Sequence, residues 1–90
     1  MLTLKITSQF RKDYKLAKKR GYNMRLLEDV MQLILDGKPL AEKHRDHALS
    51  GKYSGFRECH ILPDWLLIYQ IDNETLLLVA SRTGTHSDLF

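Results

Sequence analysis

The sequence predicts an α+β fold with the element order β-α-α-β-β-β, in which an antiparallel-rich four-stranded sheet carries two helices packed on one face. Three observations lead to this prediction: an alternating apolar stretch at residues 2–6, two stretches with helical spacing before Gly37, and three β-rich runs after residue 52. The chain has 90 residues, of which 43% are hydrophobic and 28% are charged. Because this is ordinary globular composition at the size of one small domain, we expect residues 1–90 to form a single domain.

The first half of the chain predicts one strand followed by a helical hairpin. Residues 2–6 (LTLKI) alternate apolar and polar side chains, as a half-buried strand does. Thr7 precedes a helix that ends at Gly21, and Asn23 can cap a second helix that Gly37 closes. The link between the helices is short, so we expect them to be antiparallel neighbours. The apolar side chains at helical spacing are Phe10, Tyr14 and Ala17 in the first helix, and Leu27, Val30, Met31 and Ile34 in the second.

The second half predicts three strands that follow one another in the sheet. Residues 53–61, 65–71 and 75–82 are β-rich runs, and the spacers between them are short enough for hairpins. We therefore expect an antiparallel meander. Residues 38–52 show no clean period and are expected to form an ordered loop. Because a helical hairpin covers only one side of such a sheet, we expect the other side to be open to a ligand.

Composition and cysteine content exclude several classes of protein. No apolar run approaches the roughly 20 residues of a membrane span. The N-terminal residues lack the apolar stretch and cleavage site of a signal peptide. Cys59 is the only cysteine, which excludes an internal disulfide and a four-cysteine zinc site. We therefore expect a soluble, cytoplasmic protein that does not associate with a membrane.

The formal net charge of +3 hides a strong asymmetry along the chain. Residues 1–45 carry 11 Lys or Arg against 5 Asp or Glu, a net +6, whereas residues 46–90 carry 3 against 6, a net −3. A basic half suggests a polyanionic partner, because neutralising phosphates releases counterions. The same residues can equally form a solvated helix face, so charge alone leaves both interpretations open.

Histidines, a carboxylate and an arginine lie near the ends of the predicted strands in the second half. His47 precedes the first of these strands, His60 lies within it, and Asp64 is in the turn that follows. Arg82 ends the last strand, and His86 comes shortly after it. Imidazole exchanges protons near pH 7, and cutting RNA by internal attack needs a base, an acid and positive charge at the phosphate. If these side chains converge, the set supplies that chemistry with no metal and no cofactor.

Each of these side chains also has a structural interpretation. A histidine in a strand is commonly hydrogen-bonded, and Asp64 follows a proline in a position that favours a turn. Arg82 can pair with Asp88 or Glu74. Trp65 can stack on a base, or it can cap the core at the start of a strand.

Cysteine catalysis and metal binding are both weakly supported. Cys59 and His60 are neighbours on a predicted strand, so their side chains point to opposite faces and do not form a nucleophile–base pair. We expect Cys59 to pack in the core. His44 and His47 are three residues apart in a loop with no further ligands at a set spacing, so we predict no metal site.

Three segments of the second half form an ordered set of motifs. They are residues 46–51 (DHALSG), 56–69 (FRECHILPDWLLIY) and 82–90 (RTGTHSDLF). In this order and at these separations they resemble the YafQ branch of the RelE/ParE toxin superfamily. The resemblance covers essentially the whole chain, and the superfamily shares the β-α-α-β-β-β order.

The resemblance implies the toxin of a type II toxin–antitoxin pair, a ribosome-dependent endoribonuclease that cuts mRNA in the ribosomal A site. It also implies a tightly bound DinJ-like antitoxin, and operator DNA as a partner of the toxin–antitoxin complex only. By position, the family's functional residues fall on His47, His60, Asp64 and His86, with Arg82, Trp65 and Phe90 as helpers that bind substrate. We expect His86 to act as acid or base, Asp64 to orient a histidine, and Arg82 to stabilise the transition state.

Two other functions are compatible with parts of the sequence. A ParE-like toxin shares the fold but binds DNA gyrase and cuts no RNA, and a non-toxic nucleic-acid-binding module would need only the basic half. The histidines argue against the gyrase binder, because binding alone requires no proton-transferring side chains. RelE itself relies on lysines and arginines, so its role assignments do not transfer to this chain.

Overall fold

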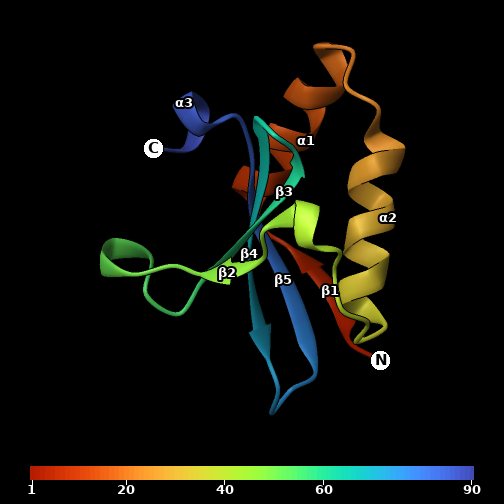
Figure 1. Cartoon of the computed structure of the whole chain (residues 1–90), viewed down its shortest axis with the longest axis vertical. Helices are drawn as coiled ribbons and strands as arrows, with labels where there is room; N and C mark the ends of the chain where they lie inside the picture. Colours follow the sequence, from red (N-terminus) through yellow and green to blue (C-terminus); the bar gives the residue numbers. More distant parts are fainter.

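The computed structural model describes residues 1–90 and shows one five-stranded mixed sheet with helices on both of its sides (Figure 1). The strand order is β1-β5-β4-β3-β2. The strands are β1 (Thr3–Ile6), β2 (His47–Ala48), β3 (Arg57–Leu62), β4 (Trp65–Asp72) and β5 (Leu77–Gly84). The helices are α1 (Ser8–Lys19), α2 (Met24–Leu35) and α3 (His86–Leu89). The α+β class is confirmed, whereas the predicted count of four strands and two helices is wrong.

The sheet is antiparallel except at one edge. Strands β3, β4 and β5 form the predicted meander, in which each strand pairs with the next. The first strand, β1, pairs in parallel with β5, with Thr3 opposite Leu77 and Ile6 opposite Ala80. The fifth strand, β2, lies in the segment expected to be a loop, where two short 3-10 helices, Glu42–His44 and Gly51–Tyr53, flank it. Because β2 has only two residues, it has no periodicity that a sequence pattern could reveal.

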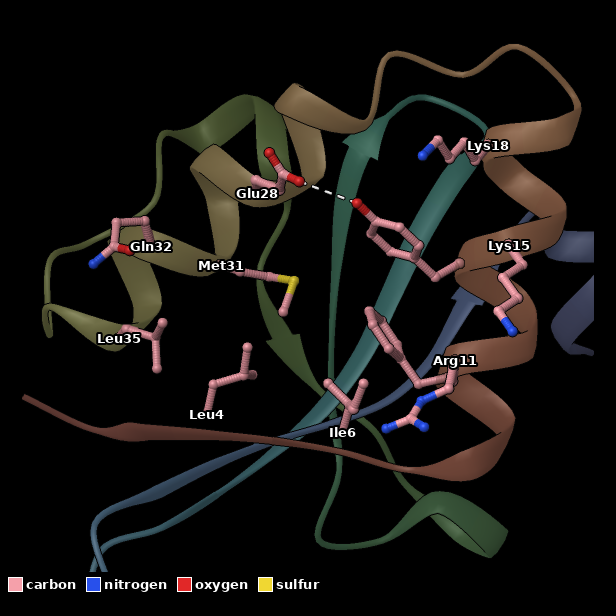
Figure 2. A pocket seen from close by; sticks show the side chains of 11 residues that line it. Leu4, Ile6, Arg11, Lys15, Lys18, Glu28, Met31, Gln32 and Leu35 are labelled. Atoms are coloured by element: carbon pink, nitrogen blue, oxygen red, sulfur yellow. Dashed lines mark hydrogen bonds between the residues drawn. The ribbon is translucent and has the colours of Figure 1, made fainter.

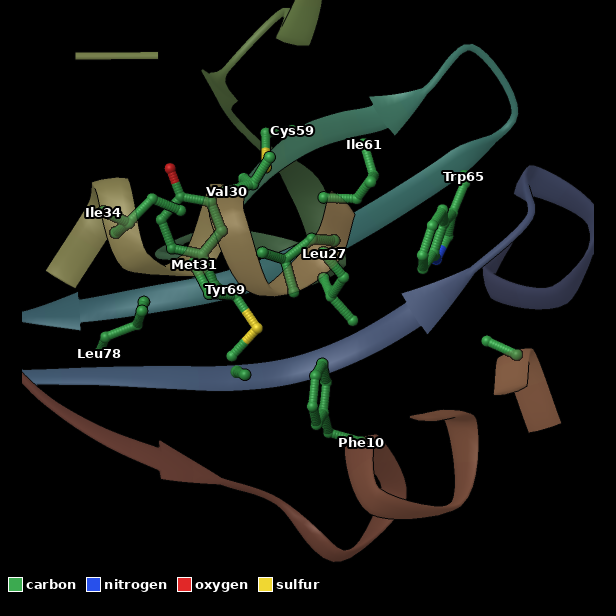
Figure 3. Close-up of a cluster of buried hydrophobic side chains, with 13 residues drawn as sticks. Phe10, Leu27, Val30, Met31, Ile34, Cys59, Ile61, Trp65, Tyr69 and Leu78 are labelled. Carbon is green, nitrogen blue, oxygen red and sulfur yellow. The ribbon is translucent and has the colours of Figure 1, made fainter. Parts of the chain in front are cut away.

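The helical hairpin forms where the capping residues and the apolar spacing predict it. The Thr7 side chain accepts a hydrogen bond from Phe10 N at 2.9 Å, and the Asn23 side chain accepts one from Arg25 N at 3.2 Å. The apolar faces of α1 and α2 pack on one side of the sheet, where α2 residues such as Leu27 and Val30 reach the strands (Figure 3). This cluster of 13 buried residues forms the main core.

The opposite side of the sheet is only partly open. Leu66 and Ile68 of β4 are fully buried there, together with Leu89 of α3. Partly buried side chains of the Gly51–Tyr53 segment and its neighbours pack around them. In Figure 1, α3 and this segment lie across the sheet from α2. The expectation that this side is open to a ligand is therefore confirmed only in part, because a small second core covers its centre. No helix of the structure combines the length and the apolar character that crossing a bilayer requires.

Candidate active site

Two histidines and a buried glutamate meet on the partly open side of the sheet. Strand pairing places His47 of β2 directly opposite Glu58 of β3, and His60 lies two residues further along the same face. Glu58 Oε1 is 3.7 Å from His47 Nε2 and 3.5 Å from His60 Nε2. The Glu58 residue is only 4% exposed. We name His47, Glu58 and His60 the strand cluster.

Backbone carbonyls fix how the two imidazole rings are turned. His47 Nδ1 lies 2.6 Å from Arg45 O, and His60 Nδ1 lies 3.2 Å from Pro63 O. Because a carbonyl only accepts hydrogen bonds, each Nδ1 must carry a proton and each Nε2 is left to exchange one. Both Nε2 atoms are the ring atoms nearest to Glu58. Its carboxylate is therefore placed to stabilise the imidazolium that forms when either ring takes up a proton.

A second group of candidate residues surrounds α3, near the C-terminus, and includes Asp64 from the turn between β3 and β4. The N–H of His86 donates to Asp64 Oδ1 at 3.3 Å, which joins the start of α3 to the turn between β3 and β4. The rings of His86 and Phe90 are 5.2 Å apart, and Phe90 is 55% exposed. Phe90 also makes an edge contact with Tyr53, at 5.4 Å between ring centroids. We name Asp64, His86 and Phe90 the terminal cluster.

A set of side-chain hydrogen bonds holds α3 in place. Asp88 Oδ2 accepts from Thr85 N at 2.9 Å, and Thr85 Oγ1 accepts from Asp88 N at 3.1 Å, which completes a capping box. Arg20, which follows α1, donates to Asp88 Oδ2 at 2.7 Å and to Oδ1 at 3.4 Å. The Arg20 guanidinium and the Thr85 N–H lower the pKa of Asp88 well below its usual range. The short helix that carries His86 is thus tied to α1.

Arg82 pairs with a residue that the sequence did not suggest. Its Nε donates to Asp13 Oδ2 at 2.8 Å and its Nη2 to Asp13 Oδ1 at 3.3 Å, and this hydrogen bonding raises the pKa of Arg82. Asp13 is buried and also accepts from Thr83 N at 3.2 Å. The expected alternatives, an ion pair with Asp88 or with Glu74, are not formed. The guanidinium is therefore held against α1 by two of its donor groups.

Trp65 lies in the core and not on the surface of the protein. It is 2% exposed, its Nε1 donates to Thr83 Oγ1 at 2.9 Å, and its ring makes an edge contact with Tyr22 at 4.9 Å. A ring buried in this way has no free face for a nucleotide base. The prediction that Trp65 stacks on substrate is therefore wrong, and the alternative, that it caps the core, is correct.

His60 is the member of the strand cluster nearest to the terminal cluster. His60 pairs with Leu66 of β4, and Leu66 pairs with Gly84 of β5, two residues before His86. Because neighbouring strands lie about 5 Å apart, the backbone at His60 is about 10 Å from the backbone at Gly84. Asp64, in the turn next to His60, is hydrogen-bonded to the His86 backbone and so joins the clusters. The terminal cluster thus lies beside the end of β3 that carries His60, whereas His47 and Glu58 lie further along the sheet, opposite Ile68 of β4.

Several residues of this region were missed or set aside at the sequence level. Glu58 shares a face with His60 by simple alternation, and that signal could have found it. Asp13 and Arg20 have no such signal, because their partners lie 69 and 68 residues away along the chain. His44 belongs to neither cluster, because its ring contacts only the backbone of His60, where its Nδ1 bonds to the carbonyl oxygen at 2.6 Å.

Cys59 is sealed in the main core, as expected. It is fully buried, and burial, followed by the charges of Asp46 and Glu58, raises the pKa of its thiol to about 12. No group of three or more His, Cys, Asp or Glu side chains is arranged to hold a metal ion.

The fold and the arrangement of these side chains define a RelE-like toxin domain. The family described as "Bacterial toxin of type II toxin-antitoxin system, YafQ" matches residues 2–90. The chain belongs to the YafQ toxin family. It is 41% identical over 88 residues to the mRNA interferase toxin YafQ of Escherichia coli K12, covering 97% of this chain and 94% of that one.

Two solved structures extend the comparison. A metal-bound toxin from Helicobacter pylori is 43% identical with a TM-score of 0.95, and all of both chains is covered. YafQ in the E. coli DinJ-YafQ complex is 40% identical with a TM-score of 0.91, covering 100% of this chain and 99% of that one.

Proposed function

We propose that this protein is the toxin of a type II toxin–antitoxin pair and that it inhibits translation by cutting mRNA. Two facts support this function. The chain belongs to a family whose E. coli members are named mRNA interferase toxins, and His47 and His60 meet at the buried Glu58 on one face of the sheet. The meeting of His47 and His60 at Glu58, with His86 just after the strand two places away in the sheet, is the observation that carries the proposal, because binding alone would not need three proton-transferring groups.

The proposed reaction is internal attack within the RNA chain. A base removes the proton from a ribose 2′-hydroxyl, and the 2′-oxygen forms a bond to the adjacent phosphorus. The bond from phosphorus to the 5′-oxygen breaks, and an acid protonates that leaving oxygen. The products are a 2′,3′-cyclic phosphate and a 5′-hydroxyl. Side chains supply every proton transfer in this sequence, so the proposal includes no cofactor and no metal.

One cluster supplies the base of this reaction and the other supplies the acid. In the strand cluster, His47 and His60 present their Nε2 atoms beside Glu58, which stabilises a ring that has gained a proton. In the terminal cluster, His86 transfers the proton at whichever oxygen, the attacking 2′-oxygen or the leaving 5′-oxygen, the strand cluster does not serve. Asp64 positions His86 by accepting a hydrogen bond from its backbone N–H. Each group that transfers a proton contributes about 10²–10⁴ in rate.

Substrate binding is assigned to two side chains near the clusters. Phe90 is exposed beside His86 and can contact a base of the bound RNA. Arg82 uses Nε and Nη2 on Asp13, which leaves Nη1 to face a phosphate and stabilise its developing charge. Trp65 acts indirectly, through its hydrogen bond to Thr83 next to Arg82.

The proposed partners follow from the same function. A relative was solved as the DinJ-YafQ toxin-antitoxin complex, which supports a DinJ-like antitoxin for this chain. We also propose that the toxin acts on ribosome-bound mRNA, and that operator DNA is bound only by the toxin–antitoxin complex. Exposed lysines of α1 that face away from the sheet, Lys12 and Lys19, are suited to ribosomal phosphates. Because translating ribosomes are cytoplasmic, we expect the toxin to act in the cytoplasm.

The gyrase-binding alternative has no comparable support. The curated E. coli relatives, at 41% identity, are named mRNA interferases. Normal growth of cells that express the toxin without a partner would favour the other alternative, a non-toxic binding module.

The test is a reconstituted translation reaction with primer extension on the mRNA. The wild-type toxin should produce discrete cuts at A-site codons, and His86→Ala should slow them by about 10²–10⁴. His44→Asn is the matched control, since it removes a histidine but keeps a donor for the His60 carbonyl. Intact mRNA with gyrase-dependent DNA breaks would refute the nuclease and support the binder.

A further inference from the structure

Strand β5 contains one extra residue just before Arg82. In the pairing of β4 with β5, successive β4 residues lie opposite Ala80 and Arg82, so Ser81 has no partner in β4. Ala80 belongs to the main core, and strict alternation would turn Arg82 toward that core as well. The extra residue forms a β-bulge, after which Thr83 takes the core side and bonds to Trp65. The bulge therefore turns Arg82 away from the core.

Beyond the bulge, α1 and its capping residue take the place of a neighbouring strand. The pairing of β1 with β5 ends at Ala80, so the following edge of β5 has no strand beside it. The Thr7 hydroxyl donates to the carbonyl oxygen of the bulge residue at 2.8 Å, and Asp13 Oδ2 accepts from Thr83 N at 3.2 Å. Buried backbone groups need such partners, because water does not reach them. Asp13 thus binds both the backbone next to Arg82 and the Arg82 side chain.

The Asp13 carboxylate is held by contacts other than Arg82. Asp13 is the only acidic residue of α1, and it is 8% exposed. Gln9, one helical turn earlier, donates to Asp13 Oδ1 at 3.1 Å, whereas the N–H of Thr83 donates to Oδ2. Because each oxygen has its own donor, one from α1 and one from β5, the plane of the carboxylate is fixed. The carboxylate is therefore already in place to receive a guanidinium.

The cations of α1 do not compete with Arg82 for this carboxylate. Residues two positions apart in an α-helix point in nearly opposite directions, about 200° apart. Arg11 and Lys15, each two positions from Asp13, line a groove that α1 forms with α2 and β1 (Figure 2), and Asp13 does not line it. The ion pair with Arg82 is the only one that Asp13 makes.

Contact through two donor groups leaves the guanidinium one orientation. A guanidinium is planar and its donors form a rigid fork, so bonding Nε and Nη2 to one carboxylate also sets the direction of Nη1. The Arg82 side chain is 30% exposed, so a ligand can reach it. A donor stabilises developing charge best when it is oriented before the reaction begins.

We propose that Asp13 is a positioning residue for mRNA cleavage, which holds the Arg82 guanidinium with Nη1 toward the phosphate that is cut. The proposal rests on the nuclease function proposed above. It predicts an effect opposite in sign to simple electrostatics. Removing a negative charge near a phosphate would by itself favour binding of RNA and the developing charge. Loss of the Arg82 orientation should instead slow cleavage.

The first test is single-turnover mRNA cleavage by Asp13→Asn on programmed ribosomes. The amide keeps the shape of the side chain but has one acceptor oxygen and no charge. We expect cleavage to slow by about 10- to 100-fold while ribosome affinity is unchanged or tighter. Asp29→Asn is the matched control, because it makes the same charge change at an exposed ion pair 3.7 Å long, and it should cut as the wild type does. If Asp13→Asn folds, by circular dichroism, and cuts at the wild-type rate or faster, the proposal is refuted.

A second comparison separates positioning from a role in the fold alone. Arg82→Gln removes the guanidinium that Asp13 holds, so adding Asp13→Asn to it should slow cleavage no further. A further loss of about the size seen for Asp13→Asn alone would refute the proposal. If Asp13→Asn alone does not fold, any further loss in the double variant, which leaves no buried charge unpaired, decides against positioning in the same way.

A third measurement does not depend on cleavage. The NMR signal of the Arg82 Nε–H should be shifted by its bond to Asp13 in the wild type, and Asp13→Asn should move it to the position of exposed arginines. A toxin that cuts mRNA but whose Arg82 signal ignores Asp13→Asn would refute the positioning role alone. If the wild type cuts no mRNA although the signal responds, the proposed function fails, and the role of Asp13 in cleavage fails with it.

Discussion

The two clusters of the candidate site are held by different kinds of interaction. In the strand cluster, backbone pairing between β2 and β3 sets the positions of His47 and Glu58. In the terminal cluster, His86 sits on a helix of four residues that is too short to be stable alone. Side chains such as Arg20 and Asp88 hold that helix. The strand cluster should therefore tolerate changes around it, whereas the terminal cluster should depend on single distant side chains.

Among substitutions of the residues that support the histidines, the largest effect should come from removing the charge of Glu58. Glu58→Gln keeps the size of the buried side chain but leaves no carboxylate beside the two Nε2 atoms. We expect mRNA cleavage to slow by about 10²-fold, in the range of a lost proton-transfer group, with little change in ribosome affinity. Single-turnover cleavage with a parallel binding measurement checks this. Unchanged cleavage would mean that Glu58 serves only the fold.

A smaller effect should follow from releasing α3. Arg20→Gln and Asp88→Asn each remove the contact between α1 and α3, so we expect about a tenfold loss of cleavage through misplacement of His86. The double variant should lose no more than the slower single variant, because both substitutions break the same contact. Arg25→Gln is the control, since its pair with Asp29 is exposed and 3.7 Å long. If the losses of the two single variants multiply in the double variant, Arg20 and Asp88 act independently of each other, and the account of a single shared contact is wrong.

The smallest effect should be a weakening of the Arg20–Asp88 contact at acidic pH. The pKa of Asp88 is lowered in the folded state, so its carboxylate stabilises the docked α3 fully above the ordinary Asp pKa of about 4. That contribution falls as the pH drops from about 4 through the lowered pKa. The Arg20 side-chain NMR signal should therefore stay constant from pH 7 to about 5 and shift only below pH 4. A shift centred near pH 6 would contradict this account.

Local patterns in the sequence were enough to predict the main elements. Capping residues and apolar spacing predicted α1 and α2, and three β-rich runs predicted the meander. The four-residue α3 and the two-residue β2 are shorter than any period that a pattern could show. Alternation along β3 correctly placed Cys59 in the core and His60 on the other face.

Long-range contacts explain what the sequence could not show about the site. Trp65 has both an apolar ring and an N–H, so only its position beside Thr83 and Tyr22 decides that it belongs to the core. The partner of Arg82 is Asp13, at the other end of the chain. Such pairs depend on how α1 crosses the sheet, which no local pattern specifies.

The most direct test of the account is a double-variant cycle between the clusters. Single-turnover mRNA cleavage would be measured for the wild type, His60→Gln, His86→Gln and the double variant, all on programmed ribosomes. If imidazoles from the two clusters act on the same phosphate, the double variant should be about as slow as the slower single variant. Losses that multiply, so that each histidine contributes independently of the other, would contradict a single site formed by both clusters.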